Sequence, residues 1–250
     1  MEDTTLKALE IIKKSKNIVV FTGAGISVPS PSSIPDFRSA NGIYNQKLKS
    51  NIRPEEIISH SFFMKYPEDF FSFYFDKMVY LNALPNQAHT YLGYLENNTK
   101  QIKAIITQNI DGLHQMGGSK NVLELHGSIH RNYCMKCHRF YNLKDTLTRY
   151  QINNKTPLCD CGGIIKPDVV LYEECLDNDV LEQSISYISQ ADTLIVIGTS
   201  LVVYPASGLI QYFHGHNLII INKSTTSLDE KFGYVIHDDI INVINKLEER

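Results

Sequence analysis

Four of the five cysteines lie in two short pairs, Cys134-x-x-Cys137 and Cys159-x-Cys161. Four thiolates are soft ligands suited to tetrahedral zinc, and two such pairs roughly 20 residues apart are typical of a zinc ribbon. The second pair is one residue shorter than usual, so disulfide or redox chemistry and a contribution from Cys175 stay open from these residues alone. We expect one structural zinc ion, because four protein ligands leave no position for water.

A second segment that could do chemistry is TGAGIS, which contains Gly23, Ala24, Gly25 and Ser27 and follows the apolar run at residues 18–21. Glycine has no Cβ atom, so a phosphate can approach the main chain closely and accept from its N–H groups. This pattern indicates a dinucleotide-binding loop. The third glycine of the usual dinucleotide fingerprint is absent, so a tight strand-to-helix turn without a ligand stays open as an alternative.

Small and polar residues also follow other apolar runs, in four groups: Gln108, Asn109 and Asp111; His126; Gly198, Thr199 and Ser200; and Asn222. Their amide, carboxylate and hydroxyl groups can bind a ribose or a phosphate. Imidazole titrates near physiological pH, which makes His126 a candidate general base. Two alternatives remain, because Asn109 and Asp111 could cap the following helix and a single histidine is more often structural.

The elements that must position these residues follow from the apolar pattern. Short runs rich in Ile and Val are typical of parallel strands buried on both faces, and they lie at residues 18–21, 102–106, 122–125, 194–197, 218–221 and 234–236. Helical spacing separates them, at residues 4–14, 87–96, 181–189 and 240–247. The alternation predicts an α/β fold with a doubly wound, Rossmann-like parallel sheet, whose carboxyl edge binds ligands.

Two segments do not fit this alternation. Residues 40–85 are aromatic and expected to be helical, and residues 131–166 contain the two cysteine pairs. We interpret both as insertions that form a smaller domain, made of a helical module and a zinc ribbon. The Rossmann-like domain would then consist of residues 1–39, 86–130 and 167–250.

Composition narrows the class of protein. The 250 residues include 24 Lys and Arg against 27 Asp and Glu, so the formal net charge is −3 and no basic footprint for nucleic acid is present. No apolar stretch reaches the roughly 18 residues that a membrane span needs, and the N-terminal segment does not resemble a signal peptide. An odd number of cysteines argues against a disulfide framework. We therefore expect a cytoplasmic protein without a nucleic-acid or membrane partner.

The chain contains, in this order, the motifs GAGIS, IPDFR, TQNIDGLH, LHGS, the cysteine quartet, KPDVV, GTSLVVYPAS and IN. Together they resemble the sirtuin family of NAD-dependent protein lysine deacylases, most of all its bacterial deacetylases. The resemblance implies NAD as co-substrate, a structural zinc ion and acetylated-lysine proteins or peptides as substrates. The acyl-lysine oxygen would attack the nicotinamide ribose, and the products would be nicotinamide, O-acetyl-ADP-ribose and free lysine. A protein mono-ADP-ribosyltransferase using the same NAD site is the alternative. A non-catalytic sensor would be expected to lack His126 or Asn109, and both are present.

The resemblance also implies individual roles. His126 would be the general base that activates a ribose hydroxyl, while Asn109 and Asp111 would hold the nicotinamide carboxamide and position the ribose and a water. Contacts with NAD are implied for Gly23, Ala24, Gly25, Ser27, Asp36, Phe37, Arg38, Gln108, Asn109, Asp111, Gly198, Thr199, Ser200, Asn222, Asp239 and Ile240. Contacts with the substrate peptide are implied for Val169, Val170, Tyr172 and Val203. We expect structural roles for His60, His89, His114 and His130, and core packing remains an alternative for Phe37.

The chain departs from the family pattern at several positions. Ser33 stands where the family usually has glycine, in a loop that is about two residues longer than usual. Glu173 also replaces a usual glycine, and its charge predicts a preference for basic residues near the target lysine. Sirtuins that remove acidic acyl groups use Tyr-x-x-Arg, and the comparable spacing here is Tyr74 with Lys77, which lacks the bidentate fork of arginine. The alternative is that Tyr74 belongs to the core and Lys77 is a solvated helix residue. Both interpretations predict acetyl or other small neutral acyl groups.

Overall fold

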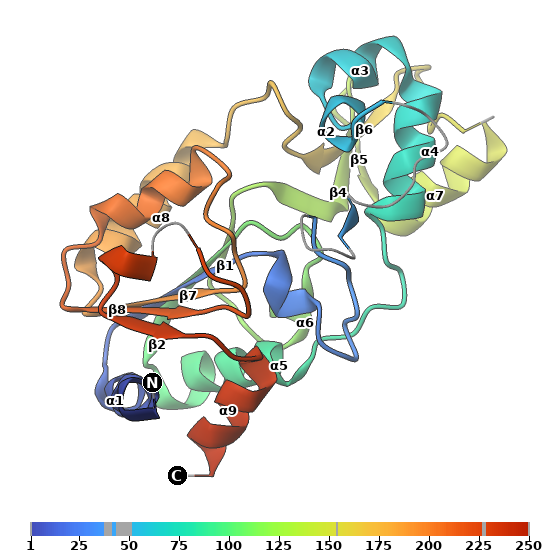
Figure 1. The fold of residues 1–250 in the computed structure, drawn as a ribbon. Coiled ribbons are helices and arrows are strands. Elements are labelled where there is room, and N and C mark those ends of the chain that lie inside the picture. The colour runs from blue at the N-terminus through green and yellow to red at the C-terminus, as the bar shows by residue number, and fades with distance from the viewer. Residues whose placement is uncertain (1, 38–41, 44–51, 154, 227–228, 250) are drawn as a thin grey trace.

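The structure is a computed structural model that describes residues 2–37, 42–43, 52–153, 155–226 and 229–249. A six-stranded sheet and a three-stranded sheet organise the chain, and Figure 1 shows them in two units that lie side by side. Within the described ranges, no helix is long and apolar enough to cross a membrane.

The large sheet is parallel throughout and has the order β3-β2-β1-β7-β8-β9. Its strands are β1 (Ile18–Thr22), β2 (Ile102–Thr107), β3 (Val122–Glu124), β7 (Thr193–Ile197), β8 (Asn217–Ile221) and β9 (Tyr234–Ile236). The chain extends the sheet outward from β1 on one side and from β7 on the other, so the switch point lies between these two strands. The predicted fold class and the six predicted strands are confirmed.

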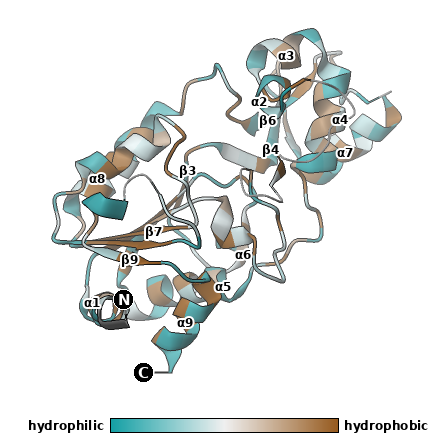
Figure 2. Ribbon diagram, in the orientation of Figure 1, coloured by the Kyte–Doolittle hydropathy of each residue, from teal (hydrophilic) through white to brown (hydrophobic). Residues whose placement is uncertain are grey.

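Helices cover both faces of this sheet (Figure 1). One face packs against α1 (Glu2–Lys14), α5 (Gln87–Tyr94) and α9 (Ile240–Glu248), and the other against α8 (Asn178–Gln190) and the 3₁₀ helix η4 (Ala206–Tyr212). Successive side chains of a strand point to opposite faces, so both faces of the strands must be apolar. Figure 2 shows the strands in brown and the outward faces of the helices largely in teal.

Side-chain caps fix where three of these helices begin. The Asn86 side chain accepts from the main chain at the start of α5, Asp177 accepts from Val180 N at the start of α8, and Asp239 accepts from Ile241 N at the start of α9. Each cap satisfies a donor that the helix itself leaves unpaired. A π-helical turn, η3 (Leu95–Thr99), follows α5.

The small unit combines an antiparallel sheet with short helices. Its sheet has the order β5-β4-β6, with β4 (Gly127–Cys134), β5 (Phe140–Asn142) and β6 (Ile165–Val169). The helices are α2 (Pro54–Ile57), α3 (His60–Lys65), α4 (Pro67–Lys77) and α7 (Leu143–Ile152), so most of the described part of 40–85 is helical, whereas residues 78–85 are not. Its core is aromatic, with the rings of Phe63 and Phe70 packed edge to face at a centroid distance of 4.9 Å. The remaining elements are η1 (Ala24–Ser27), α6 (Leu113–Met116) and η5 (Asp229–Lys231).

The borders expected between the two domains fall inside strands of the small sheet. The border after residue 130 lies within β4, and the border before residue 167 lies within β6. The small sheet therefore extends a few residues beyond the predicted insertion at each end. The division into a large and a small domain stays a prediction.

Main-chain packing between the turns after β1 and β7 generates a prediction about Gly198. Gly198 has φ 61°, and a Cβ atom there would lie 2.5 Å from Ile26 N, whereas Gly118 has φ 100° and open space around its missing Cβ atom. Gly118→Ala should lower the free energy of unfolding only by the cost of a left-handed conformation, about 1–2 kcal/mol. Gly198→Ala should lower it by about 1–3 kcal/mol more, because the added Cβ atom overpacks this contact. Thermal unfolding of both variants measures this, and an equal loss of stability would contradict the packing account.

Candidate functional site

A pocket of about 530 Å³ lies at the carboxyl ends of the central strands, where residues of both units meet. All of the described residues to which the resemblance assigned NAD or peptide contacts line it, except Gly23. Arg38 lies outside the described residues. Segments far apart in the sequence therefore form one site, as the strand-end argument predicted.

The two glycines after β1 pack against the turn after β7. The N–H groups of Gly23 and Gly25 donate to the carbonyl oxygens of Ile197 and Gly198, at 3.0 and 2.8 Å. A Cβ atom on Gly25 would lie 2.7 Å from the Cα atom of Gly198. The alternative of a tight turn thus accounts for part of this motif, because the glycines are needed for close main-chain packing. Ala24 and Gly25 nevertheless line the pocket.

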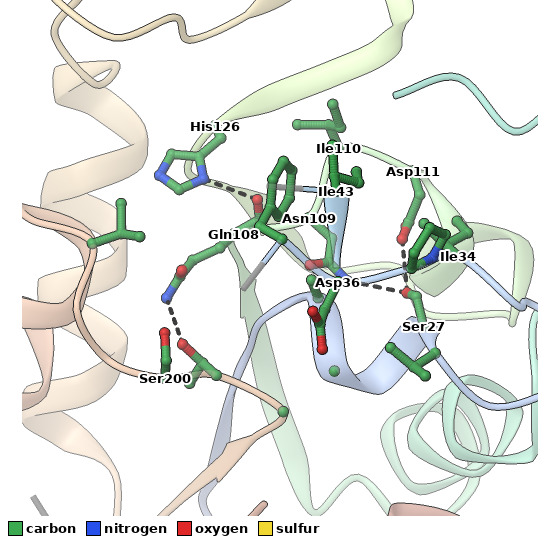
Figure 3. Close-up of a pocket in the computed structure, with 18 of the residues that line it drawn as sticks. Ser27, Ile34, Asp36, Ile43, Gln108, Asn109, Ile110, Asp111, His126 and Ser200 are labelled. Carbon is green, nitrogen blue, oxygen red and sulfur yellow. Dashed lines mark hydrogen bonds between the residues drawn. The ribbon is translucent and has the colours of Figure 1, made fainter. Parts of the chain in front are cut away.

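The Ser27 hydroxyl is the centre of a polar cluster in this pocket. It donates to Asp111 Oδ2 at 2.7 Å and accepts from Asn109 Nδ2 at 3.1 Å (Figure 3). A hydroxyl has a single proton, so donation to Asp111 leaves only its lone pairs for Asn109. The loop after β1 therefore fixes the two side chains after β2. The sequence indicated Ser27 as an NAD contact but not as the residue that holds Asn109 and Asp111.

Asp111 has a second, structural contact. Its Oδ1 atom accepts from Leu113 N at 2.9 Å, at the start of α6. The carboxylate that accepts from Ser27 therefore also pairs a main-chain donor at the start of α6, although the N-cap residue of this helix is Gly112. Burial raises the pKa of Asp111, while hydrogen bonds from Leu113 N–H and the Ser27 hydroxyl lower it.

His126 lies at the turn from β3 into β4 and points into the pocket (Figure 3). Its Nδ1 atom is 2.9 Å from the carbonyl oxygen of Gln108. A carbonyl can only accept, so Nδ1 carries the proton and Nε2 of the neutral ring keeps a lone pair. Burial lowers the pKa of His126, opposed by this hydrogen bond. The side chain is therefore a neutral base with a defined tautomer.

Two further histidines lie behind the Ser27 cluster. His89 Nε2 is 3.4 Å from Ser27 Oγ, and its Nδ1 atom accepts from Asn86 N at 3.2 Å. His114 Nε2 is 3.0 Å from Thr22 Oγ1, and the two imidazole rings pack edge to face at 5.0 Å. Burial lowers the pKa of His89 to about 4, so its ring is neutral. Both are buried, in agreement with the structural role expected for them.

At the opposite end of the pocket, polar groups follow β8 and precede α9. Asn222 and Asp239 line the pocket, and Asp239 also caps α9 and forms an ion pair with Lys223 at 2.7 Å. Gln108 donates to Thr199 Oγ1 at 3.4 Å, which links the turns after β2 and β7. Hydroxyl, amide and carboxylate groups on this side can bind ribose hydroxyls.

The small unit gives the pocket an apolar wall that the sequence did not predict. Ile43, Ile58, Met78 and Ile129 line it from the small unit, and Ile110 joins them from the loop after β2. Phe37 also lines the pocket and packs against the core of the small unit, so its two interpretations are compatible. No local motif marks these residues, because they become neighbours only when the helices pack on the small sheet.

Tyr74 cannot act with Lys77 as an anion-binding pair. The Tyr74 ring is fully buried and packs 5.8 Å from the ring of Phe70. Lys77 lines the pocket, with its Nζ atom 3.1 Å from Asp76 Oδ2. The structure thus agrees with the interpretation of Tyr74 as a core residue, while Lys77 is a partly buried residue of the pocket wall.

The four predicted zinc ligands form one cluster, in which the sulfur atoms all lie within 4.8 Å of one another. Cys134 and Cys161 are 3.5 Å apart, as are Cys137 and Cys159. Tetrahedral thiolates at zinc are roughly 3.8 Å apart, as Zn–S bonds of about 2.3 Å require. The Tyr141 hydroxyl donates to Cys159 Sγ at 3.1 Å. Donor set and spacing therefore fit a structural zinc ion, and Cys175 does not belong to the cluster.

Comparison with known proteins gives the family. The sequence model of the Sir2 family matches residues 23–205 of the chain. The NAD-dependent protein deacetylase of Clostridium perfringens (strain 13 / Type A) is 57% identical over 249 residues, which cover 99% of each protein. The chain belongs to the Sir2 family.

Other Sir2-type proteins agree with this. The NAD-dependent protein deacetylase of Staphylococcus aureus (strain COL) is 44% identical over 244 residues, covering 97% of this chain and 96% of that protein. A solved structure described as Sir2 with a p53 peptide and NAD⁺ has a TM-score of 0.84 at 38% identity, covering 97% of this chain and 96% of the other. Similarity thus extends over almost the whole fold.

Both departures from the glycine pattern of Sir2 proteins occur at left-handed positions. Ser33 has φ 51° and Glu173 has φ 76°. Such values are costly for residues other than glycine, which is the residue that the resemblance led us to expect at both positions. The Glu173 carboxylate accepts from Ser61 N and Ser61 Oγ, both at 2.9 Å. Both donors are neutral groups, and the expected preference for basic residues near the target lysine stays a prediction.

For the zinc cluster of this Sir2 chain, Cys134→Ala and Cys159→Ala should both lose the metal and destabilise the small sheet. Zinc binding is coupled to folding and has apparent free energies of about 10–16 kcal/mol in zinc-finger peptides. Metal analysis and thermal unfolding measure the two effects. Cys175→Ala is the matched control and should keep one zinc per chain. Wild-type protein purified without zinc would contradict the assignment.

Proposed function

We propose that this chain removes acetyl groups from protein lysine side chains, with NAD as co-substrate and one water molecule consumed, giving nicotinamide, O-acetyl-ADP-ribose and free lysine. The observation that carries the proposal is the 2.9 Å contact between His126 Nδ1 and the Gln108 carbonyl, which requires the proton on Nδ1 and leaves Nε2 as the basic nitrogen of a ring that lines the pocket. The Sir2 relatives, named NAD-dependent protein deacetylases, support it.

His126 is the general base of this reaction. Its neutral ring can accept a proton from a ribose hydroxyl, and burial keeps it neutral at physiological pH. The hydrogen bond to Gln108 orients the ring without consuming its basic nitrogen. A site for simple NAD hydrolysis would not need a base directed at a ribose hydroxyl.

Asn109 and Asp111 hold the nicotinamide end of NAD. Both side chains are fixed by Ser27, so they present a defined set of amide and carboxylate atoms to the pocket. The residues after β7 and β8, with Asp239 and Ile240 before α9, bind the adenosine half. NAD supplies an anomeric carbon that an acyl oxygen can attack, and the residues of the pocket bind and orient it.

The acyl-lysine occupies the side of the pocket formed by the small unit. Val169, Val170 and Tyr172 line this side, Val203 lines the pocket from the segment after β7, and the aliphatic wall suits the alkyl stem of a lysine. An extended peptide would add as a strand along the residues that follow β6 and those near Val203.

The same proposal includes one structural zinc ion in the cysteine cluster, a cytoplasmic location and no nucleic-acid or membrane partner. Supporting observations are the four clustered thiols, the absence of a disulfide among the five cysteines and the net charge of −3. The proposal also divides the chain into a Rossmann-like domain and a small domain, at about the predicted borders.

The proposal is tested by following the products of NAD with mass spectrometry, with and without an acetyl-lysine peptide. Deacetylated peptide, nicotinamide and O-acetyl-ADP-ribose should form in equal amounts, and only with the peptide. ADP-ribosylated protein would favour the alternative, a protein mono-ADP-ribosyltransferase, and loss of NAD without peptide would favour an NAD glycohydrolase.

In the same assay, His126→Ala should reduce kcat by roughly 10²- to 10⁴-fold and leave NAD binding largely unchanged, because general-base catalysis contributes about that much. His214→Ala, at an exposed histidine outside the pocket, is the control and should keep wild-type turnover. Because burial lowers the pKa of His126, wild-type turnover should fall only below the usual imidazole value of 6.5. Wild-type turnover by His126→Ala would refute the base assignment.

The pocket wall predicts the acyl preference. With one peptide sequence, kcat/KM should fall from acetyl-lysine to succinyl-lysine, because the wall is aliphatic and Lys77 already contacts Asp76. A charge-assisted hydrogen bond contributes about 1.5–3 kcal/mol, so its absence corresponds to tenfold or more at about 1.4 kcal/mol per decade. Peptides of both types are compared by steady-state kinetics. Equal or faster turnover of succinyl-lysine would contradict this preference.

A further inference from the structure

The strand that begins directly after His126 is irregular. In the pairing of β4 with β6, Ser128 is opposite Asp168 and Asn132 is opposite Pro167. Four positions along β4 therefore correspond to one position along β6, and residues 129–131 leave this ladder as a bulge. Bulges beside active sites often redirect side chains.

Each residue of the bulge donates a hydrogen bond to the large unit, Ile129 and His130 to the loop after β2 and Arg131 to the end of β3. Ile129 N donates to the Ile110 carbonyl at 3.0 Å, and His130 Nε2 donates to the Asp111 carbonyl at 3.0 Å. Arg131 Nη1 donates to Glu124 Oε2 at 2.6 Å, and its Nε donates to Asp168 Oδ2 at 2.7 Å. The bulge thus connects the small sheet to the loop after β2 and to the end of β3.

The two partners of Arg131 belong to the strand that precedes His126 and to the strand that pairs with the residues after it. Glu124 is the last residue of β3 and precedes His126 by two positions. Asp168 lies in β6 and pairs with Ser128, which follows His126 by two positions. The Glu124 side chain is only 9% exposed, and its second oxygen accepts from Gln115 Nε2 at 2.9 Å. A short pair with a nearly buried carboxylate is screened less than a surface pair. The Arg131 guanidinium therefore links β3, which precedes the turn that contains His126, to β6, which pairs with the strand after this turn.

We infer that Arg131 is a positioning residue for His126, which fixes the catalytic turn by bridging Glu124 and Asp168. The expected effect on the rate rests on the proposed function, whereas the expected effect on the position of His126 does not. The planar fork of arginine suits this bridge, because two of its nitrogens donate to two carboxylates in different strands. A displacement of about 1 Å at a catalytic group can cost roughly 100-fold in rate.

The deciding experiment compares two reactions of Arg131→Gln. In the proposed mechanism His126 acts after nicotinamide has left, so exchange of labelled nicotinamide into NAD reports the earlier step. Arg131→Gln should lower kcat for deacetylation by roughly 10- to 100-fold, while exchange changes much less. Arg131→Lys should recover part of the loss, because a cation remains but the fork does not. Equal loss of both reactions, or wild-type rates for both, would overturn the inference.

An activity-independent measurement separates this inference from the proposed function. The ring signal of His126 in NMR spectra, assigned by its absence in His126→Gln, should shift or broaden in Arg131→Gln. It should not change in Arg139→Gln, which removes an exposed ion pair with Asp160 in the same unit. If wild-type protein does not deacetylate peptides, the proposed function fails and this signal alone decides. If Arg131→Gln does not fold, Glu124→Gln takes its place, and an unchanged His126 signal in a folded variant would refute the inference.

Discussion

The parallel pairing of β1 with both β2 and β7 is the constraint on which the site depends. Thr22 is in register with Thr107 on one side and with Ile197 on the other, so three strands end at the same level. The next residue of each strand, among them Gln108 and Gly198, must therefore enter the same small region. Gln108 N donates to the Thr22 carbonyl at 3.0 Å, which extends the ladder to the floor of the pocket. Main-chain hydrogen bonding alone thus brings together three loops from distant parts of the sequence.

His126 occupies the junction between the two sheets, and this location has a steric requirement. Gly127 has φ 73°, and a Cβ atom at this position would overlap the Asp168 carbonyl oxygen. The His126 carbonyl accepts from Val170 N at 3.0 Å, on a segment that also lines the pocket. His126 is therefore held by the small sheet as well as by the large one. Any change in the packing of the two sheets would move the base relative to Asn109 and Asp111.

The buried polar residues beneath the pocket have few alternative arrangements. The Ser27 hydroxyl serves both Asn109 and Asp111, and His89 approaches the same oxygen from below. Burial raises the pKa of Asp111 and lowers the pKa of His89, so the surroundings disfavour charge on both groups. An unpaired polar group here would cost about 1–3 kcal/mol, which favours a single arrangement of the cluster. The side of the pocket that Asn109 and Asp111 line is consequently held in one arrangement.

The sequence by itself determined the parallel sheet, its strand positions and most of the residues at its carboxyl edge. Runs of Ile and Val report burial on both faces, and polar residues that follow parallel strands must converge at one edge. The cysteine spacing likewise indicated the four-thiol cluster. Only the tertiary structure decided the role of Ser27 as a shared partner, the aliphatic wall that includes Met78, and the bulge that carries Arg131. These features depend on contacts between segments distant in sequence, and local periodicity does not encode which side chains meet across two packed units.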